Sequence, residues 1–346
     1  MLEVPMHDGA RLQVVIAGEG PAILLPVRPW PIQGPQADEM RKWGSDPALG
    51  RTLIDGLSDR YRVIAFDYEG HVLGTPKALT LTPDRVAADF LAIADAAGAA
   101  RFAYYGYSWL ALAGMQLALR TDRLDALIMG GYPPMGGPYK EMLQVTMATH
   151  AMSGASGAAG QAAGDWSEGA QSGAAEAGGR TAGGWTEGAQ SGAGEATGQM
   201  AGDWSEGAQS GAGEVTGRTA GDWTDEAQES SNWEDYDWST VEVAMNRDQT
   251  RQFVTLYEAL QDFDDRAAQA LIVCPRLCFA GTADRIAYGA NFGGVTVDIA
   301  GAFADNRESL EAAGWEVRML QGLDHTKAMQ AAQVLPLIQP WLDTKL

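Results

Sequence analysis

The stretch from 101 to 120 constrains the fold of this chain more than any other. Residues 101–105 form a short, mostly apolar or aromatic run, which predicts a buried strand. Residues 111–120 are rich in helix-forming Ala, Leu, Met and Gln. Ser108 stands between them. A sharp turn from strand to helix lifts a serine hydroxyl above the sheet and aims the N–H groups of the helix start at whatever the serine attacks. We therefore predict that Ser108 is a nucleophile at the edge of a sheet.

The motif around this serine is close to G-x-S-x-G but ends on Leu110 in place of glycine. Glycines relieve crowding in a strained turn, so a leucine has to fit where a small residue is usual. The alternative is a serine that only caps an ordinary helix. The choice between the two depends on the chemical partners that the rest of the chain provides.

Strands and helices alternate through the first 130 residues. We predict strands at 12–17, 22–25, 62–67, 101–105 and 124–130, helices at 37–43, 49–59, 82–97 and 111–120, and a glycine-bearing loop at 68–76. After the break described below, we predict helices at 248–270, 305–313 and 328–342 and strands at 276–280 and 315–320. This order is typical of an α/β fold with a mostly parallel central sheet flanked by helices. Its site is expected at the carboxyl ends of the strands.

The alternation breaks after 139. A helix is predicted at 140–152, and a 19-residue repeat follows, with tryptophans at 166, 185, 204 and 223. Each repeat has one large apolar residue amid Gly, Ala, Ser and Glu. Burying that residue does not offset the loss of chain entropy on folding, which costs roughly 1–2 kcal/mol per residue. We expect a disordered insertion over about 153–230. The alternative is a repeat that binds a partner through its tryptophans.

The composition of the chain argues against some classes of binding partner. A net charge of −21 argues against nucleic acid and anionic membranes, and no run of 18 apolar residues or secretory signal is present. If Cys274 and Cys278 share one face of a strand, as we predict, they lie about 13 Å apart, too far for a disulfide. Free thiols are typical of a reducing cytoplasm. No metal site and no cofactor are indicated. A small-molecule substrate is expected, and the oligomeric state is left open.

Three chemically matched residues follow successive predicted strands: Ser108, Asp284 and His325. A serine hydroxyl needs a base within hydrogen-bond reach, and the base needs an acid to orient it. The chain order Ser, Asp, His is found in one class of serine hydrolase. Two other carboxylates are candidates for the acid, but Asp67 is expected to fix its own loop and Asp324 to be exposed.

These motifs resemble those of the α/β-hydrolase fold family. The matching pieces are Gly106-Tyr107-Ser108-Trp109, the segment 279–284, Gly322-Leu323-Asp324-His325 and the segment 66–71. The resemblance implies a core made of residues 1–138 and 271–346. It also implies a cap region at 139–270, largely disordered because it contains the repeat.

By this resemblance Ser108 is the nucleophile, His325 the general base and Asp284 its orienting acid. The oxyanion hole would use the N–H of Trp109 and one from Val27 or Arg28, because the usual His-Gly of that loop is replaced by Pro26-Val27-Arg28-Pro29. Trp30 and Tyr107 are expected to border the substrate pocket, together with Trp109.

The resemblance implies a serine hydrolase that cleaves a small carboxylic ester, lactone or thioester. Amide or C–C cleavage, as in proline iminopeptidases, is a close variant. Dehalogenase and epoxide hydrolase chemistry needs an aspartate nucleophile, which Ser108 excludes. A non-catalytic ligand-binding or interaction protein on the same fold is the rival hypothesis, suggested by Leu110 and the unusual oxyanion loop.

Overall fold

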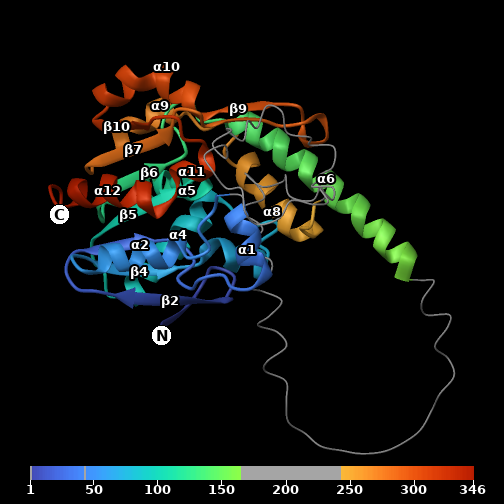
Figure 1. The fold of residues 1–346 in the computed structure, drawn as a ribbon, viewed down its shortest axis with the longest axis horizontal. Coiled ribbons are helices and arrows are strands. Elements are labelled where there is room, and N and C mark those ends of the chain that lie inside the picture. The colour runs from blue at the N-terminus through green and yellow to red at the C-terminus, as the bar shows by residue number, and fades with distance from the viewer. Residues whose placement is uncertain (1, 43, 165–242) are drawn as a thin grey trace, which may run out of the picture.

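The computed structural model describes residues 2–42, 44–164 and 243–346, and its centre is an eight-stranded sheet (Figure 1). The strand order is β1-β2-β4-β3-β5-β6-β7-β10. β1 and β2 are antiparallel, as are β2 and β4, and all other neighbours are parallel. The predicted mostly parallel sheet is confirmed. The strands are β1 (Leu2–Pro5), β2 (Arg11–Ala17), β3 (Ala22–Leu25), β4 (Arg62–Phe66), β5 (Phe102–Tyr107), β6 (Leu124–Gly130), β7 (Arg276–Gly281) and β10 (Trp315–Leu320).

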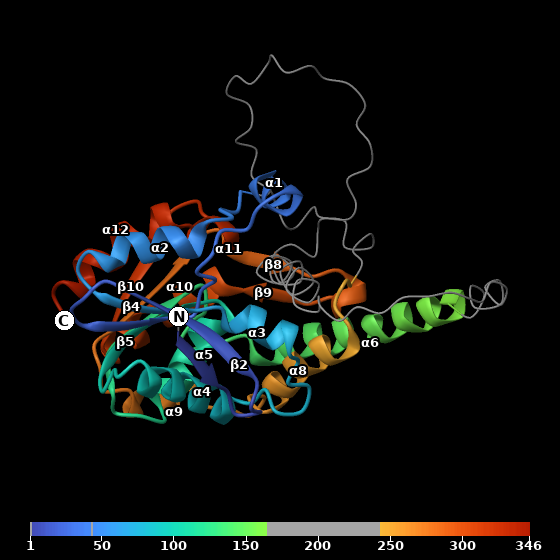
Figure 2. The ribbon, with the colours of Figure 1, turned by 90° about the horizontal axis from the view of Figure 1, so that it is seen from below.

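Helices cover both faces of the sheet, with α2 and α12 on one and α4 and α5 on the other (Figure 2). The alternation within β5 explains the two layers. Phe102 and Tyr104 pack with α4 and α5, whereas Ala103 and Tyr105 pack with α2 and α12. The helices are α1 (Pro35–Lys42), α2 (Leu49–Ser58), α3 (Tyr68–Gly74), α4 (Pro83–Ala96), α5 (Trp109–Ala118), α6 (Tyr139–Gly164), α8 (Arg247–Glu258), α9 (Asp265–Ala268), α10 (Ile299–Ala312), α11 (His325–Ala328) and α12 (Ala331–Leu342).

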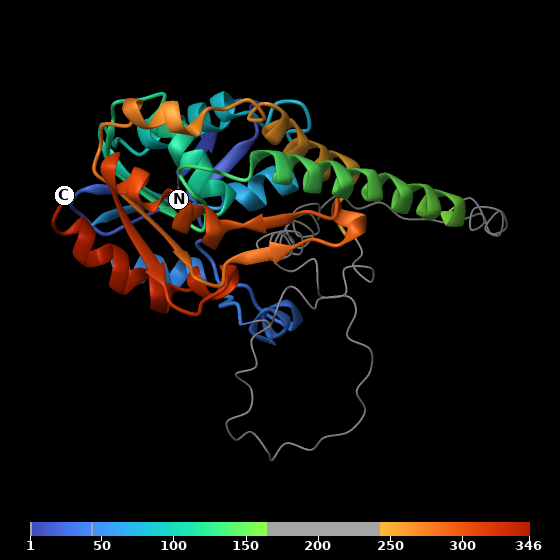
Figure 3. The same ribbon diagram turned by 90° about the horizontal axis from the view of Figure 1, so that it is seen from above.

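A small hairpin and two helices stand beside the carboxyl ends of the strands. The hairpin β8 (Arg285–Ala287) and β9 (Thr296–Asp298) runs alongside α6 (Figure 3), and α6 packs against α8. The Gln144 side chain joins helix and hairpin, because its Nε2 donates to the Gly293 carbonyl at 2.9 Å. The hairpin was not predicted from the sequence.

Two predicted elements are wrong. Residues 68–74 form α3 in place of a loop, since the Asp67 carboxylate caps the helix by accepting the Gly70 N–H at 2.8 Å. The helix predicted over 248–270 ends at Glu258. A second helix, α9, begins after Asp264, whose side chain accepts the Ala267 N–H at 3.0 Å.

The region of the repeat is described only at its start. α6 continues to Gly164, beyond the predicted end at 152. The predicted disordered insertion over about 153–230 otherwise lies outside the described residues. Cys274 and Cys278 are both free thiols. Within the described ranges, no helix is long and apolar enough to cross a membrane.

Candidate active site

Ser108 occupies a strained turn between β5 and α5. Its φ is 55° and its ψ −133°, and among the described residues it is the one non-glycine with a positive φ. Such a conformation costs about 1–3 kcal/mol and persists where the surroundings hold it. Here the Ser108 N–H donates to the Gly130 carbonyl at the end of β6, at 2.9 Å. The geometry is that of a nucleophile elbow.

The unusual Leu110 fits this turn without crowding it. A Cβ at Gly106 would lie 2.6 Å from the Leu110 carbonyl carbon, so the close approach is made by the backbone of residue 110 and requires glycine at 106. The Leu110 side chain is buried in the hydrophobic core, and its carbonyl accepts a hydrogen bond from the Tyr104 hydroxyl at 2.7 Å. The glycine of the usual motif is therefore needed at the first position and not at the last.

His325 and Asp284 form a buried pair, with His325 Nδ1 2.9 Å from Asp284 Oδ2. Asp284 lies in the loop after β7, and His325 begins α11 just after β10. The two loops meet at Gly281, where a Cβ would strike the Leu323 carbonyl. Burial disfavours the imidazolium, but the charge and hydrogen bond of Asp284, with a smaller contribution from Asp324, outweigh it and raise the pKa of His325.

Asp324 is buried, so the expectation that it is exposed is wrong. Its carboxylate caps α11 by accepting the Lys327 N–H at 2.8 Å, and it pairs with the Lys327 ammonium at 3.1 Å. The carboxylate that bonds to the imidazole is that of Asp284. Asp67 caps α3 and fixes its own segment, as predicted.

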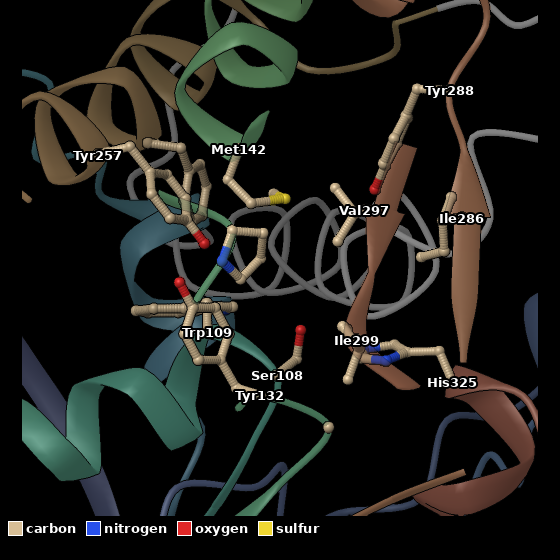
Figure 4. A pocket seen from close by; sticks show the side chains of 13 residues that line it. Ser108, Trp109, Tyr132, Met142, Tyr257, Ile286, Tyr288, Val297, Ile299 and His325 are labelled. Atoms are coloured by element: carbon tan, nitrogen blue, oxygen red, sulfur yellow. The ribbon is translucent and has the colours of Figure 1, made fainter. Parts of the chain in front are cut away.

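Ser108 and His325 line one cavity (Figure 4), although no direct hydrogen bond joins these two described side chains. Hydrogen bonds of this kind are often long in unliganded sites and tighten with substrate. The cavity has an empty volume of about 470 Å³, including its open side. Its described wall is made of Ser108, Trp109, Gly131, Tyr132, Pro138, Met142, Phe253, Tyr257, Ile286, Tyr288, Val297, Ile299 and His325.

Of the three aromatic residues expected at the pocket, only Trp109 is part of this wall. The Tyr107 side chain lies behind the histidine, where its hydroxyl donates to the His325 carbonyl at 2.8 Å and its ring centre is 5.0 Å from the imidazole. Trp30 is 39% exposed and lies outside the described wall. Sequence reasoning missed the residues of the hairpin and of α8, because they come from segments far apart in the chain.

The two candidate oxyanion donors, Val27 and Arg28, lie in the loop between β3 and α1. The Val27 N–H already donates to the Leu25 carbonyl at 2.9 Å. The Arg28 carbonyl is pressed against Gly50 of α2, where a Cβ would collide with it. This packing fixes the backbone of the loop at Arg28. Trp109 begins α5, where backbone N–H groups have no partner within the helix.

Glu69 is a site residue that sequence reasoning missed. Its Oε1 accepts a hydrogen bond from Trp109 Nε1 at 3.0 Å. Burial, opposed by the tryptophan and aided by the nearby Asp67, raises the pKa of Glu69 to about 7. The two residues are 40 positions apart, and no local pattern reveals the contact. No group of three or more potential metal ligands occurs in the described part of the chain.

No family model and no curated protein matches the sequence. Solved structures do match. The chain is similar to an epoxide hydrolase from Vigna radiata, with 16% identity, a TM-score of 0.52, and 99% of this chain and 97% of that one covered. It is similar to the enol-lactonase from Burkholderia xenovorans LB400, with 18% identity, a TM-score of 0.51 and 99% of each chain covered.

A thermophilic esterase from Thermogutta terrifontis matches at 13% identity and a TM-score of 0.50, with 99% of this chain and 98% of that chain covered. At sequence identities this low, structural similarity shows only that the folds are alike. The sheet order, with its antiparallel start and parallel remainder, and the sharp turn at Ser108 agree with them. This chain has the α/β-hydrolase fold.

Proposed function

We propose that the protein is a serine hydrolase that cleaves a small carboxylic ester, lactone or thioester through an acyl-enzyme. One observation carries the proposal: Ser108, held in a strained turn, lines the same cavity as the His325–Asp284 pair. A serine that only capped α5 would not need a strained backbone conformation. The similarity to an esterase and an enol-lactonase supports the proposal at the level of the fold.

The orientation of the imidazole sets the roles in the reaction. Nδ1 of His325 faces Asp284, so Nε2 is left to take the Ser108 proton as the oxygen attacks the substrate carbonyl. The N–H groups of Trp109 and of Val27 or Arg28 would stabilise the oxyanion. His325 then returns the proton to the leaving oxygen or sulfur, the acyl group remains on Ser108, and a water deprotonated by His325 releases the acid.

The cavity favours esters over the peptide-like substrates of an iminopeptidase. An aminopeptidase substrate carries an ammonium group beside the scissile bond, and burying it without a carboxylate is costly. No Asp or Glu is among the described residues of the wall. C–C cleavage by the same triad stays an alternative.

The rival hypothesis is a non-catalytic binding protein, which the engaged Val27 N–H favours. The two hypotheses are separated by hydrolysis of short p-nitrophenyl esters and by labelling with a fluorophosphonate, each with the wild type and Ser108→Ala. We expect the wild type to hydrolyse and to be labelled, and the variant to do neither. A folded wild type that shows neither reaction would overturn the proposed function.

A further inference from the structure

The cavity above Ser108 is built for an uncharged ligand. No acidic residue, lysine or arginine is present among the described residues that line it, and most of the wall is aromatic or aliphatic. Besides Ser108 and His325, the polar side-chain atoms of the wall are the Tyr132, Tyr257 and Tyr288 hydroxyls and the indole nitrogen of Trp109. That nitrogen is held by Glu69. The Tyr132 hydroxyl is one of the remaining groups of the wall that can recognise a substrate by hydrogen bonding.

Tyr132 is only 3% exposed, and its buried hydroxyl lacks a hydrogen-bond partner within the described ranges. A buried polar group without a partner is destabilising, and native proteins rarely leave one unless water or a ligand completes it.

The position of Tyr132 is fixed relative to the nucleophile. It follows Gly130 and Gly131, and the Gly130 carbonyl holds the Ser108 N–H. Its ring packs edge-on against Tyr139 with centres 6.0 Å apart. Burial raises the pKa of Tyr132, as do the nearby hydroxyls of Tyr139 and Tyr257, so the group is a neutral hydrogen-bond donor over the working pH range.

Tyr132 lies on the acyl side of the site. Figure 4 shows Trp109, Tyr132 and Tyr257 on one side of Ser108, and His325 with the hairpin residues on the other. Because His325 must protonate the leaving group, the leaving alcohol lies on the histidine side. The acyl part of the substrate therefore extends toward Tyr132.

We propose that Tyr132 is a substrate-binding residue whose hydroxyl donates to an uncharged oxygen in the acyl group, so that the substrates are neutral esters of oxo- or alkoxy-acids. This specificity rests on the proposed function. The expected substrate has an apolar body and a second oxygen a few atoms from the scissile carbonyl. A purely hydrocarbon acyl group would leave the hydroxyl without a partner and lose the corresponding binding energy.

The test compares p-nitrophenyl levulinate with p-nitrophenyl valerate, which differ by one ketone oxygen in the acyl chain. The measured quantity is the ratio of kcat/KM for the two esters, which cancels any loss of folded enzyme. We expect the wild type to prefer the levulinate about tenfold, the value of one hydrogen bond. Tyr132→Phe should reduce the ratio to about one. Tyr139→Phe is the matched control, since Tyr139 is buried next to Tyr132 outside the described wall, and should keep the wild-type ratio.

A measurement of how tightly the same two esters bind separates this inference from the proposed function. Calorimetry with the two esters and Ser108→Ala, with and without Tyr132→Phe, reports recognition whether or not the wild type is a hydrolase. A levulinate preference that depends on Tyr132 supports the inference even if the wild type fails to hydrolyse esters. An unchanged ratio in the Tyr132→Phe variant, by either method, would overturn it and indicate that the hydroxyl meets only water.

Discussion

The carboxylate of Glu69 on α3 accepts a hydrogen bond from the indole of Trp109, the residue directly after the nucleophile, at 3.0 Å. The Trp109 side chain lines the cavity, and its N–H is the expected oxyanion donor of the proposed site. The indole also packs edge-on against Phe253 of α8, with ring centres 5.6 Å apart. Glu69 therefore acts as a positioning residue for the tryptophan.

Glu69→Gln is expected to change how stability depends on pH. The pKa of Glu69 is raised from 4.5 to about 7 in the folded protein, so between these values the folded state binds more protons than the unfolded state, and stability falls as pH rises. Gln keeps the hydrogen-bond acceptor without the titration. Chemical denaturation should show the variant more stable than wild type by about 1–3 kcal/mol at pH ~8 and equal near pH ~4. The exposed Glu308→Gln is the control and should follow the wild type. Parallel pH profiles for all three proteins would mean that Glu69 ionises normally.

Asp284→Asn should abolish most hydrolysis while the protein stays folded. The amide would hold the imidazole in the wrong tautomer, a change that lowers kcat about 10⁴-fold in serine proteases. Because the pKa of His325 is raised by Asp284 and the reaction needs the neutral imidazole, wild-type kcat/KM should increase with pH through a pKa above 6.5.

Asp324→Asn is the matched control for this change, since asparagine also caps helices and Asp324 does not bond to the imidazole. It should cost no more than a few-fold in kcat. Equal losses in the two variants would remove Asp284 from its assigned role.

Gly50→Ala is expected to disturb the proposed oxyanion hole from outside the cavity. The new Cβ would overlap the Arg28 carbonyl, so the backbone of the loop must move. Overpacking of this kind costs about 1–3 kcal/mol, and removal of an oxyanion donor costs about 10²–10³ in kcat. Ester kinetics and thermal unfolding measured together separate the two effects.

Gly74→Ala serves as the control, because a Cβ there meets nothing within 4 Å and the backbone conformation is ordinary. It should leave kcat unchanged. If Gly50→Ala loses stability and retains full kcat, the 26–29 loop does not supply the donor.

Restoring the usual motif with Leu110→Gly should damage the protein. The leucine side chain is buried in the core, and its removal leaves a cavity in addition to a glycine in α5. We expect a loss of about 3–5 kcal/mol in the free energy of unfolding and no gain in kcat, with Leu110→Ala in between. A variant as stable as wild type, or more active, would show that Leu110 strains the turn.

The sequence alone determined the layers of the fold and the order of the chemistry. The strands at 124–130 and 315–320 were predicted with the bounds that the structure has. The first is a short, mostly apolar run and the second begins with alternating apolar and charged residues, and turn signals flank both. Ser108, Asp284 and His325 were each placed after a strand, and parallel strands bring such positions to one edge.

Other features were decided by tertiary structure, because they depend on contacts between distant segments. α3 forms where glycines suggested a loop, since Asp67 caps it and its residues are buried. The break at Glu258, the hairpin after Asp284 and the Glu69–Trp109 hydrogen bond leave no local pattern. The wall of the cavity joins side chains from the segment after β6, from α6 and α8, and from the hairpin. Local propensity specifies strands and turns, whereas burial and pairing across the chain select which polar groups meet, and only the folded chain brings them together.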